Sequence, residues 1–276
     1  MTTMSTITDR SGAELRYNVH GAGTPVLNLH GAYSTHEEIA AILEPLFDSG
    51  AGYRRLYPDL PGMGETPGHT SVHSVNDVVD LLDRLVSAEI GSEPFLVIGH
   101  SFGAHLARGI AARHPDQVAG LALICPMVAP NTAEAHPSSH IADEPSELID
   151  PDHLDDYNGY FVVRTDATAV RFNEAVVPSL GRFESEAVAA LMSDTMLRPD
   201  PDHVVCSAPT LVLTGRHDSF RRLPRPTGPD RHLPQRHPRC TCSRRTCVAT
   251  RTPDADEPDT PRLAQSNRHR PPRVRP

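Results

Sequence analysis

The chain has 276 residues and a formal net charge of −9, which is long enough for one α/β domain with an inserted segment. Residues 1–220 hold 12 Arg and 30 acidic residues, whereas residues 221–276 hold 14 Arg and 5 acidic residues. No apolar run reaches membrane-spanning length and residues 1–17 lack an apolar leader core, so we expect neither a membrane span nor a signal peptide, and a cytoplasmic protein by default. Five cysteines, only two of them before residue 220, argue against a disulfide scaffold.

Short β-rich runs alternate with helical patterns through the first 126 residues, which predicts a mostly parallel sheet flanked by helices. The predicted strands span residues 14–19, 26–30, 55–58, 95–99 and 120–125. Residues 74–90 carry apolar side chains at helical spacing, and Ser74 with Asp77 forms a capping box at the start. A second helix is expected after Ser101, ending near Pro115.

From about residue 130 to residue 203, helical patterns are interrupted by proline and acidic clusters, which predicts a helical lid inserted into the core. The predicted lid helices span residues 147–154, 168–177 and 184–196, and strand character returns at 210–214. The expected organisation is a core at 1–129, a lid at 130–205 and a last core piece at 206–220. Residues 221–276 contain 11 Pro and no aromatic residue, so we expect them to be disordered.

The pentapeptide Gly99, His100, Ser101, Phe102 and Gly103 fits the pattern G-x-S-x-G, directly after an apolar strand and directly before a helix. The turn is so sharp that its flanking positions must be glycine, because a Cβ atom there would clash. It lifts the serine hydroxyl out of the sheet beside a helix N-terminus, which stabilises developing negative charge. Ser101 is therefore the candidate nucleophile, with Gly99 and Gly103 as the glycines of the turn.

Two further stretches supply partners for this serine. His-Gly-Ala at 30–32 ends a predicted strand, and the backbone N–H groups of Ala32 and Phe102 are the candidate oxyanion hole, with Tyr33 as the alternative to Ala32. Asp218 follows the strand predicted at 210–214, in the chain order serine then acid. That is the place of the acid that orients a catalytic histidine.

Together with Tyr-Pro-Asp-Leu-Pro-Gly-Met-Gly at 57–64, these stretches resemble the α/β-hydrolase family, especially its capped serine esterase and proline-iminopeptidase-like branch, from residue 14 to about 220. The resemblance implies an eight-stranded sheet, a helical lid, no cofactor and an acyl-enzyme on Ser101. It points to hydrolysis of carboxylic esters or small amides. Serine at 101 disfavours the haloalkane-dehalogenase branch, which places aspartate there.

The resemblance stops after Asp218. The family closes its triad with a histidine on the loop after the last strand, usually as Gly-His, but His232, His237 and His269 each follow arginine in Pro/Arg-rich sequence. The catalytic histidine is therefore unassigned, and the C-terminal strand and helix of the fold are predicted to be missing. A shift of reading frame near codon 220 accounts for both, because the codons of residues 245–247 permit Gly-His in the alternative frame.

Other interpretations of the chain remain open. Acidic lid residues at Asp143, Glu144, Asp155 and Asp156 would suit a proline-iminopeptidase-like enzyme that binds a substrate amine, and a chain without the histidine would be a catalytically dead pseudo-hydrolase. The apolar lid side chains either bind an acyl group or pack against the core; they are Tyr160, Phe161, Val162, Val163, Phe172, Val176, Val177, Leu191 and Met192.

The C-terminal residues suggest no partner or metal. His237 with Cys240, Cys242 and Cys247 matches no paired cysteine spacing of a zinc site, so no metal is expected. The basic tail has no aromatic residue to stack on bases, which argues against a nucleic-acid partner. The identity of the substrate and the oligomeric state are left open.

Overall fold

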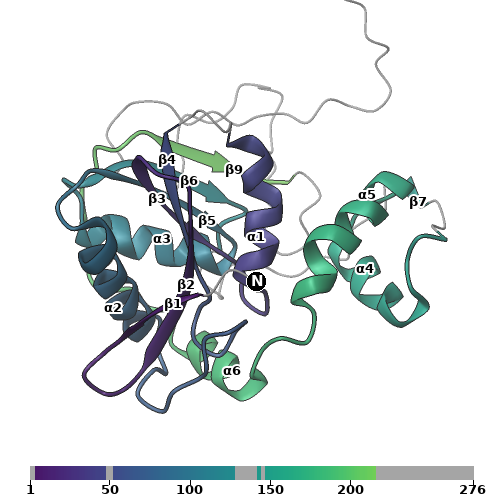
Figure 1. The fold of residues 1–276 in the computed structure, drawn as a ribbon, viewed down its shortest axis with the longest axis horizontal. Coiled ribbons are helices and arrows are strands. Elements are labelled where there is room, and N and C mark those ends of the chain that lie inside the picture. The colour runs from purple at the N-terminus through teal and green to yellow at the C-terminus, as the bar shows by residue number, and fades with distance from the viewer. Residues whose placement is uncertain (1–3, 48–51, 128–141, 144–146, 216–276) are drawn as a thin grey trace, which may run out of the picture.

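The computed structural model describes residues 4–47, 52–127, 142–143 and 147–215 (Figure 1). Its main sheet is built from β1 (Ser5–Thr8), β2 (Glu14–His20), β3 (Thr24–Leu29), β4 (Tyr53–Pro58), β5 (Phe95–His100), β6 (Val118–Ile124) and β9 (Thr210–Leu213). The strand order is β1-β2-β4-β3-β5-β6-β9. All neighbours from β4 to β9 run parallel, and the pairs β1–β2 and β2–β4 are antiparallel. The predicted mostly parallel sheet is confirmed, with seven strands within the described residues instead of the implied eight.

The predicted strands match the observed ones closely, because β3 is a buried apolar run and β2 buries every second residue at Leu15 and Tyr17. In the middle of the sheet, Leu27 of β3 lies between Leu56 of β4 and Val97 of β5. Strand β1 was not predicted. Its four residues are mostly exposed and carry no apolar alternation, so only their pairing with β2 makes them a strand.

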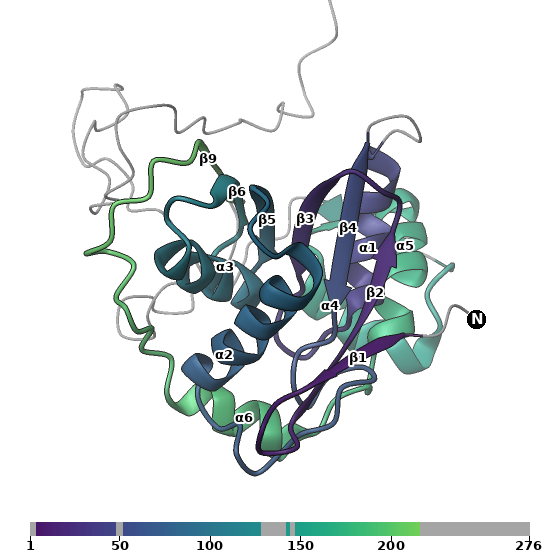
Figure 2. The same cartoon turned by 60° about the vertical axis from the view of Figure 1, so that its left-hand side comes forward.

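Three helices cover the two faces of the sheet. Helices α2 (Val75–Leu85) and α3 (Phe102–Arg113) pack on one face, and α1 (His36–Leu43) packs on the other (Figure 2). The predicted capping box of α2 is present, because Ser74 N–H donates to Asp77 Oδ2 at 2.9 Å and Asp77 N–H donates to Ser74 Oγ at 3.3 Å. Helix α1 was not predicted, since its eight residues are too few to show a clear period.

Between β6 and β9 the chain forms a largely helical segment, and we refer to residues 147–205 as the insert. It contains η3 (Pro151–His153), α4 (Leu154–Tyr160), α5 (Asp166–Arg171), η4 (Phe172–Val176), η5 (Val177–Ser179) and α6 (Ser185–Ser193). Two-residue strands β7 (Ala142–Asp143) and β8 (Val163–Arg164) also pair here. Of these elements, η4 and η5 contact α1.

Two of the predicted lid helices are confirmed and one is wrong. The helix predicted at 168–177 corresponds to α5 continued by η4, and the one predicted at 184–196 corresponds to α6, which ends earlier, at Ser193. The helix predicted at 147–154 begins later, with η3 at Pro151, and continues as α4. Asp150 accepts a hydrogen bond from the Asp152 N–H as an N-cap, and Pro151 occupies the first helical turn, where its missing N–H costs nothing.

The described residues form one large core and two smaller ones, and one of the smaller cores consists of Ile39 and Leu43 of α1 with Tyr57 of β4. The large core lies against the sheet and includes the fully buried Phe95, Val97 and Phe102. The other small core belongs to the insert and consists of Ile149, Tyr157, Ala169, Phe172 and Val176. Packing therefore accounts for several of the apolar lid side chains, whereas Tyr160 and Val163 remain substantially exposed.

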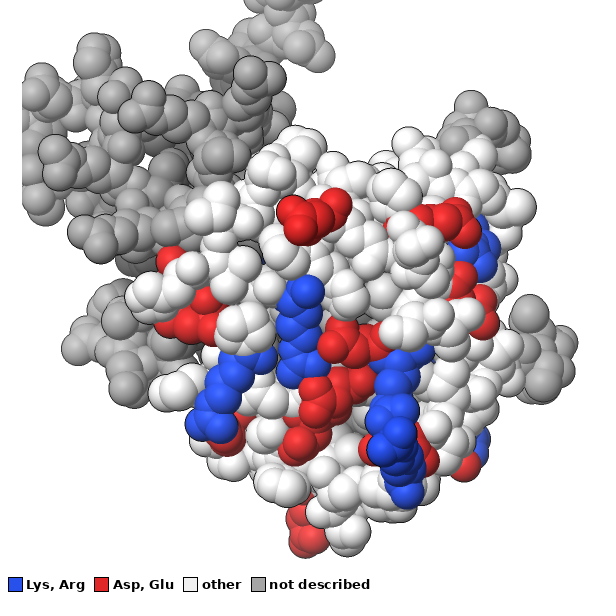
Figure 3. Space-filling model, turned by 90° about the vertical axis from the view of Figure 1, so that its left-hand side faces the viewer, with Lys and Arg blue, Asp and Glu red and all other residues white. Residues whose placement is uncertain are grey.

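Charged side chains are interleaved over the face that carries α2 and α3 (Figure 3). Arg113, for example, contacts both Asp80 and Asp83, at 2.5 and 2.9 Å. No described helix is long and apolar enough to cross a membrane, and the described residues contain no cluster of metal-ligand side chains. The first part of the predicted lid, Asp218, the histidines and cysteines after it and the tail at 221–276 lie outside the described residues.

Candidate active site

Ser101 lies in the turn between β5 and α3, with φ 54° and ψ −111°. A positive φ is uncommon for a residue with a side chain and costs conformational energy. Three backbone hydrogen bonds hold the turn: Ser101 N–H donates to Ile124 O at 2.9 Å, and Ser101 O accepts from the N–H groups of His105 and Met127 at 3.2 and 3.1 Å. The sheet and α3 together therefore impose the strained conformation that the G-x-S-x-G pattern predicts.

The two glycines of this turn are required by close backbone approach. A Cβ atom on Gly99 would lie 2.4 Å from Gly103 O, and one on Gly103 would lie 2.2 Å from Leu29 O. The turn thus packs directly on the end of β3. A Cβ atom on Gly31 would lie 3.5 Å from the Cβ of Ser101, so the loop after β3 adjoins the serine.

Two backbone N–H groups near the serine are free to donate. Within the described residues, neither the Ala32 N–H nor the Phe102 N–H has a hydrogen-bond acceptor. The Phe102 group belongs to the first turn of α3, whose N–H groups have no partner within the helix. Tyr33, the alternative to Ala32, has φ 62° and places its half-exposed ring edge-on against Phe183, with 5.1 Å between ring centroids.

A buried histidine anchors the start of this loop. Leu60 N–H donates to His30 Nε2 at 2.9 Å, so Nε2 accepts, and the Nδ1–H donates to Gly31 O at 2.7 Å. The His30 ring is therefore neutral. Burial, the largest influence, lowers the pKa of His30 to about 4 despite the nearby Asp59 carboxylate.

Asp59 is the second buried anchor. Its fully buried carboxylate accepts hydrogen bonds from the N–H groups of His36 at 2.7 Å and Glu65 at 2.8 Å, and His36 Nδ1 lies 2.9 Å from Oδ1. Burial opposes ionisation, but the contacts with His36 and His30 hold the pKa of Asp59 below its ordinary value. In the sequence, Asp59 stood out only as part of the segment at 57–64. Its position between two histidine rings is visible only in the structure.

A second buried carboxylate, Glu38, was missed altogether. It lies on α1, is 3% exposed, and accepts hydrogen bonds from Ser34 and Tyr160. Burial raises its pKa. The i, i+4 spacing of Ser34 and Glu38 was the available signal, but α1 itself was not predicted.

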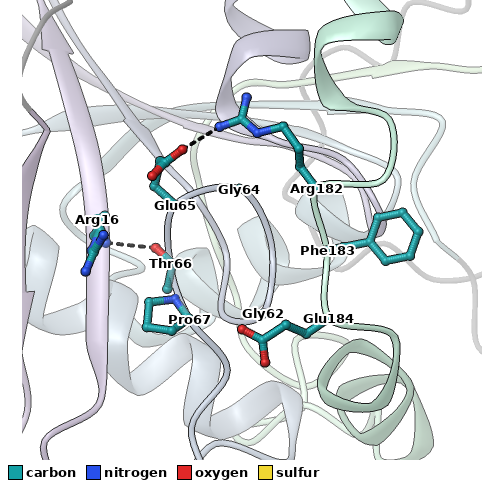
Figure 4. A pocket seen from close by; sticks show the side chains of 9 residues that line it. All are labelled: Arg16, Gly62, Gly64, Glu65, Thr66, Pro67, Arg182, Phe183 and Glu184. Atoms are coloured by element: carbon teal, nitrogen blue, oxygen red, sulfur yellow. Dashed lines mark hydrogen bonds and ion pairs between the residues drawn. The ribbon is translucent and has the colours of Figure 1, made fainter.

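A pocket of about 380 Å³ lies away from the serine (Figure 4). It lies between the loop from Gly62 to Pro67 and the segment from Arg182 to Glu184, with Arg16 at its edge. Ser101 does not line it, and Arg182 is bound to Glu65 at 2.7 Å across its rim. We therefore assign no substrate to this pocket.

These features define an α/β-hydrolase fold with its serine turn and adjoining loop. Residues 24–167, more than half of the chain, match the family model for the alpha/beta hydrolase fold, and the chain belongs to that family. It is 35% identical to epoxide hydrolase 2 of Siraitia grosvenorii over 130 residues, 44% of this chain and 36% of the relative. It is 37% identical to a lipase of Mycobacterium tuberculosis over 98 residues, 36% of this chain and 35% of the lipase.

The chain thus spans about a third of the length of the curated relatives it matches. Among solved structures, an alpha/beta superfamily hydrolase from Oenococcus oeni aligns with a TM-score of 0.70 and 24% identity, over 79% of this chain and 82% of its own. A thermophilic esterase from Thermogutta terrifontis aligns with a TM-score of 0.57 and 24% identity, over 80% and 83%. At this identity the two structures support the fold.

Replacing Gly103 by alanine tests the close approach of the serine turn to β3. We expect Gly103→Ala to lower the free energy of unfolding by roughly 3 kcal/mol, because the backbone of β3 cannot move away from the new methyl group. The matched control is Gly159→Ala in α4, where a Cβ atom would meet nothing within 4 Å. Urea denaturation should find the control unchanged or stabilised by up to about 1 kcal/mol. Equal stability of the two variants would contradict the close approach.

The buried neutral His30 predicts a pH dependence of stability. Between pH 6.5 and about 4 the unfolded chain binds a proton at His30 that the folded chain does not, so stability falls as the pH falls. The loss should total on the order of 3 kcal/mol over this window. His30→Gln should be less stable at pH 7 but lose less stability on acidification, as measured by urea unfolding at several pH values. His73→Gln, at a side chain 71% exposed, is the control and should keep the wild-type slope.

Proposed function

We propose that this protein is a serine hydrolase of carboxylic esters or small amides that acts through an acyl-enzyme on Ser101. The supporting observation is the strained turn of Ser101 between β5 and α3, with the loop after β3 packed against it. In this reaction Ser101 Oγ attacks the substrate carbonyl carbon, the leaving group departs, and water then hydrolyses the acyl-enzyme.

The proposed oxyanion hole consists of the N–H groups of Ala32 and Phe102. Both are unpaired within the described residues, and both belong to segments fixed by the sheet. Donors held in place before the reaction stabilise the developing negative charge without reorganising, and one such donor contributes roughly 3 kcal/mol to transition-state stabilisation. The same proposal treats residues 1–129 and 206–220 as the hydrolase core and residues 130–205 as its lid.

The curated relatives differ in the substrates their names state, and the serine favours one of these classes. Opening an epoxide with a serine hydroxyl would leave an ether on the enzyme, which water does not readily cleave. Attack on an ester or amide leaves an ester, which water can cleave. Ser101 therefore supports ester or amide hydrolysis, as in the lipase relative, over the epoxide hydrolysis named for the first relative.

The proposed acid is Asp218, and the proposed base is a histidine that the present reading frame does not encode. Under this proposal residues 221–276 are the product of a frame shift near codon 220. If they are a genuine tail, the chain is a pseudo-hydrolase that binds ligands without turnover. A proline-iminopeptidase-like activity is the other alternative, and it rests on the exposed acidic residues Asp155 and Asp156 at the start of α4.

The chain with its present residues 221–276 should hydrolyse p-nitrophenyl acetate scarcely faster than its Ser101→Ala variant. Without a base the serine hydroxyl stays protonated and is a weak nucleophile, and losing the histidine of such a triad costs about a millionfold in kcat. The measurement compares initial rates of the two purified proteins. A rate thousands of times higher in the unmutated chain would mean that a working base is present.

Restoring the alternative frame after codon 220 should restore reactivity, read as covalent labelling of Ser101 by a fluorophosphonate probe. Labelling should vanish in Ser101→Ala and fall by roughly 10⁴ in Asp218→Asn, because the wrong histidine tautomer is then favoured. Asp80→Asn, on the outer surface of α2, is the control and should label normally. If genomic sequencing confirms the present frame and the alternative frame gains no labelling, the frame-shift proposal is wrong.

A further inference from the structure

Four of the six residues from Tyr33 to Glu38, which follow β3, contact the insert. The other two are Ser34, which donates to Glu38, and His36, which lies against Asp59. The direct contacts to the insert are Tyr33 with Phe183, Thr35 with Ser179, Glu37 with Arg182, and Glu38 with Tyr160. The segment beside Ser101 is therefore held from two sides, by the insert and by the buried Asp59.

Glu38 forms the central link. Its carboxylate is 3% exposed, and no arginine or histidine within the described residues pairs with it. Its hydrogen-bond donors are two hydroxyls: Ser34 Oγ from the loop, and Tyr160 OH from α4, which lies 3.2 Å from both carboxylate oxygens. When a buried carboxylate loses a hydrogen-bond donor, the cost of its desolvation is no longer compensated. Glu38 therefore couples the loop to the insert.

The backbone strain at Tyr33 gives this coupling a consequence. Tyr33 has φ 62°, a conformation that an aromatic residue keeps only when its surroundings enforce it. Its ring rests on Phe183, whose own backbone pairs with Met63 after β4. If the contact with Phe183 is lost, Tyr33 loses this support, and the N–H of the preceding Ala32 is free to rotate.

We propose that Glu38 is a positioning residue through which the insert holds the loop after β3, so that displacing the insert dismantles the site of the Ala32 N–H. The coupling follows from the contacts above. The consequence of this coupling for oxyanion stabilisation rests on the proposed function. Substrate entry that requires the insert to move would then switch off transition-state stabilisation until the insert returns, and reactivity would be confined to the closed state.

Hydrogen exchange of the full chain tests the coupling without requiring catalysis. The reporters are the backbone amides of His36 and Glu37, which donate to Asp59 Oδ1 and Thr35 Oγ1. Tyr160→Phe removes only the hydroxyl that reaches Glu38. We expect exchange at both reporters to become about fivefold faster, as for the loss of one hydrogen bond.

Tyr157→Phe is the matched control, since Tyr157 OH donates to Thr165 O at 3.2 Å and lies 2.7 Å from Thr168 Oγ1, all within the insert. It should accelerate exchange in the insert and leave both reporters unchanged. Ser179→Ala removes the partner of Thr35 Oγ1 and provides a second link to break, with the same expected acceleration at the reporters.

Two results would overturn the proposal: reporters that stay unchanged in Tyr160→Phe, whatever Ser179→Ala does, or reporters that accelerate equally in Tyr157→Phe. The second result would mean that the loop merely follows the overall stability of the insert. Repeating the measurement in Ser101→Ala should give the same pattern as the unmutated background. A failure of the proposed hydrolase, read by labelling, is therefore separate from a failure of the coupling, read by exchange.

Discussion

The contact between the serine turn and the end of β3 is the constraint on which the rest of the site depends. At Gly103 the two backbones approach so closely that a single methyl group would collide with the carbonyl oxygen of Leu29. This approach sets the start of α3 against the loop after β3 and brings Ser101 beside Gly31. The positive φ of Ser101 is the cost of that arrangement, and the hydrogen bonds from β6 and α3 hold it in place.

The loop after β3 is itself ordered by buried polar groups rather than by apolar packing. The neutral His30 holds Gly31 and Leu60 together, while the Asp59 carboxylate accepts hydrogen bonds from the start of α1 and from the loop after β4. Such networks stabilise one geometry because every unpaired member would incur a desolvation penalty. They also tie the loop to the protonation state of His30.

The insert completes this arrangement from the other side. Its first part has a small apolar core around Phe172 and Tyr157 and contacts α1 and the loop before it, whereas α6 packs into the large core through Val188 and Leu191. The contacts of the insert with residues 33–38 are hydrogen bonds, an ion pair and one aromatic pair. These polar contacts can open and close more readily than the apolar contact of α6 with the large core, because water can satisfy their polar groups when they separate.

The sequence by itself determined the sheet, α2 and α3 with their ends, and the serine turn. Buried strands and capped helices can be recognised from the local spacing of apolar residues and from the residues that form turns and caps. It also identified the loop at 30–32. Short elements stabilised by distant partners were beyond its reach: β1 exists through its pairing with β2, and α1 through its packing on β3 and β4. Only the tertiary structure placed Asp59 between His30 and His36, and Glu38 between Ser34 and Tyr160. A carboxylate on an exposed helix and a buried carboxylate that joins two segments look alike along the chain, and they differ only in which residues the fold brings to them.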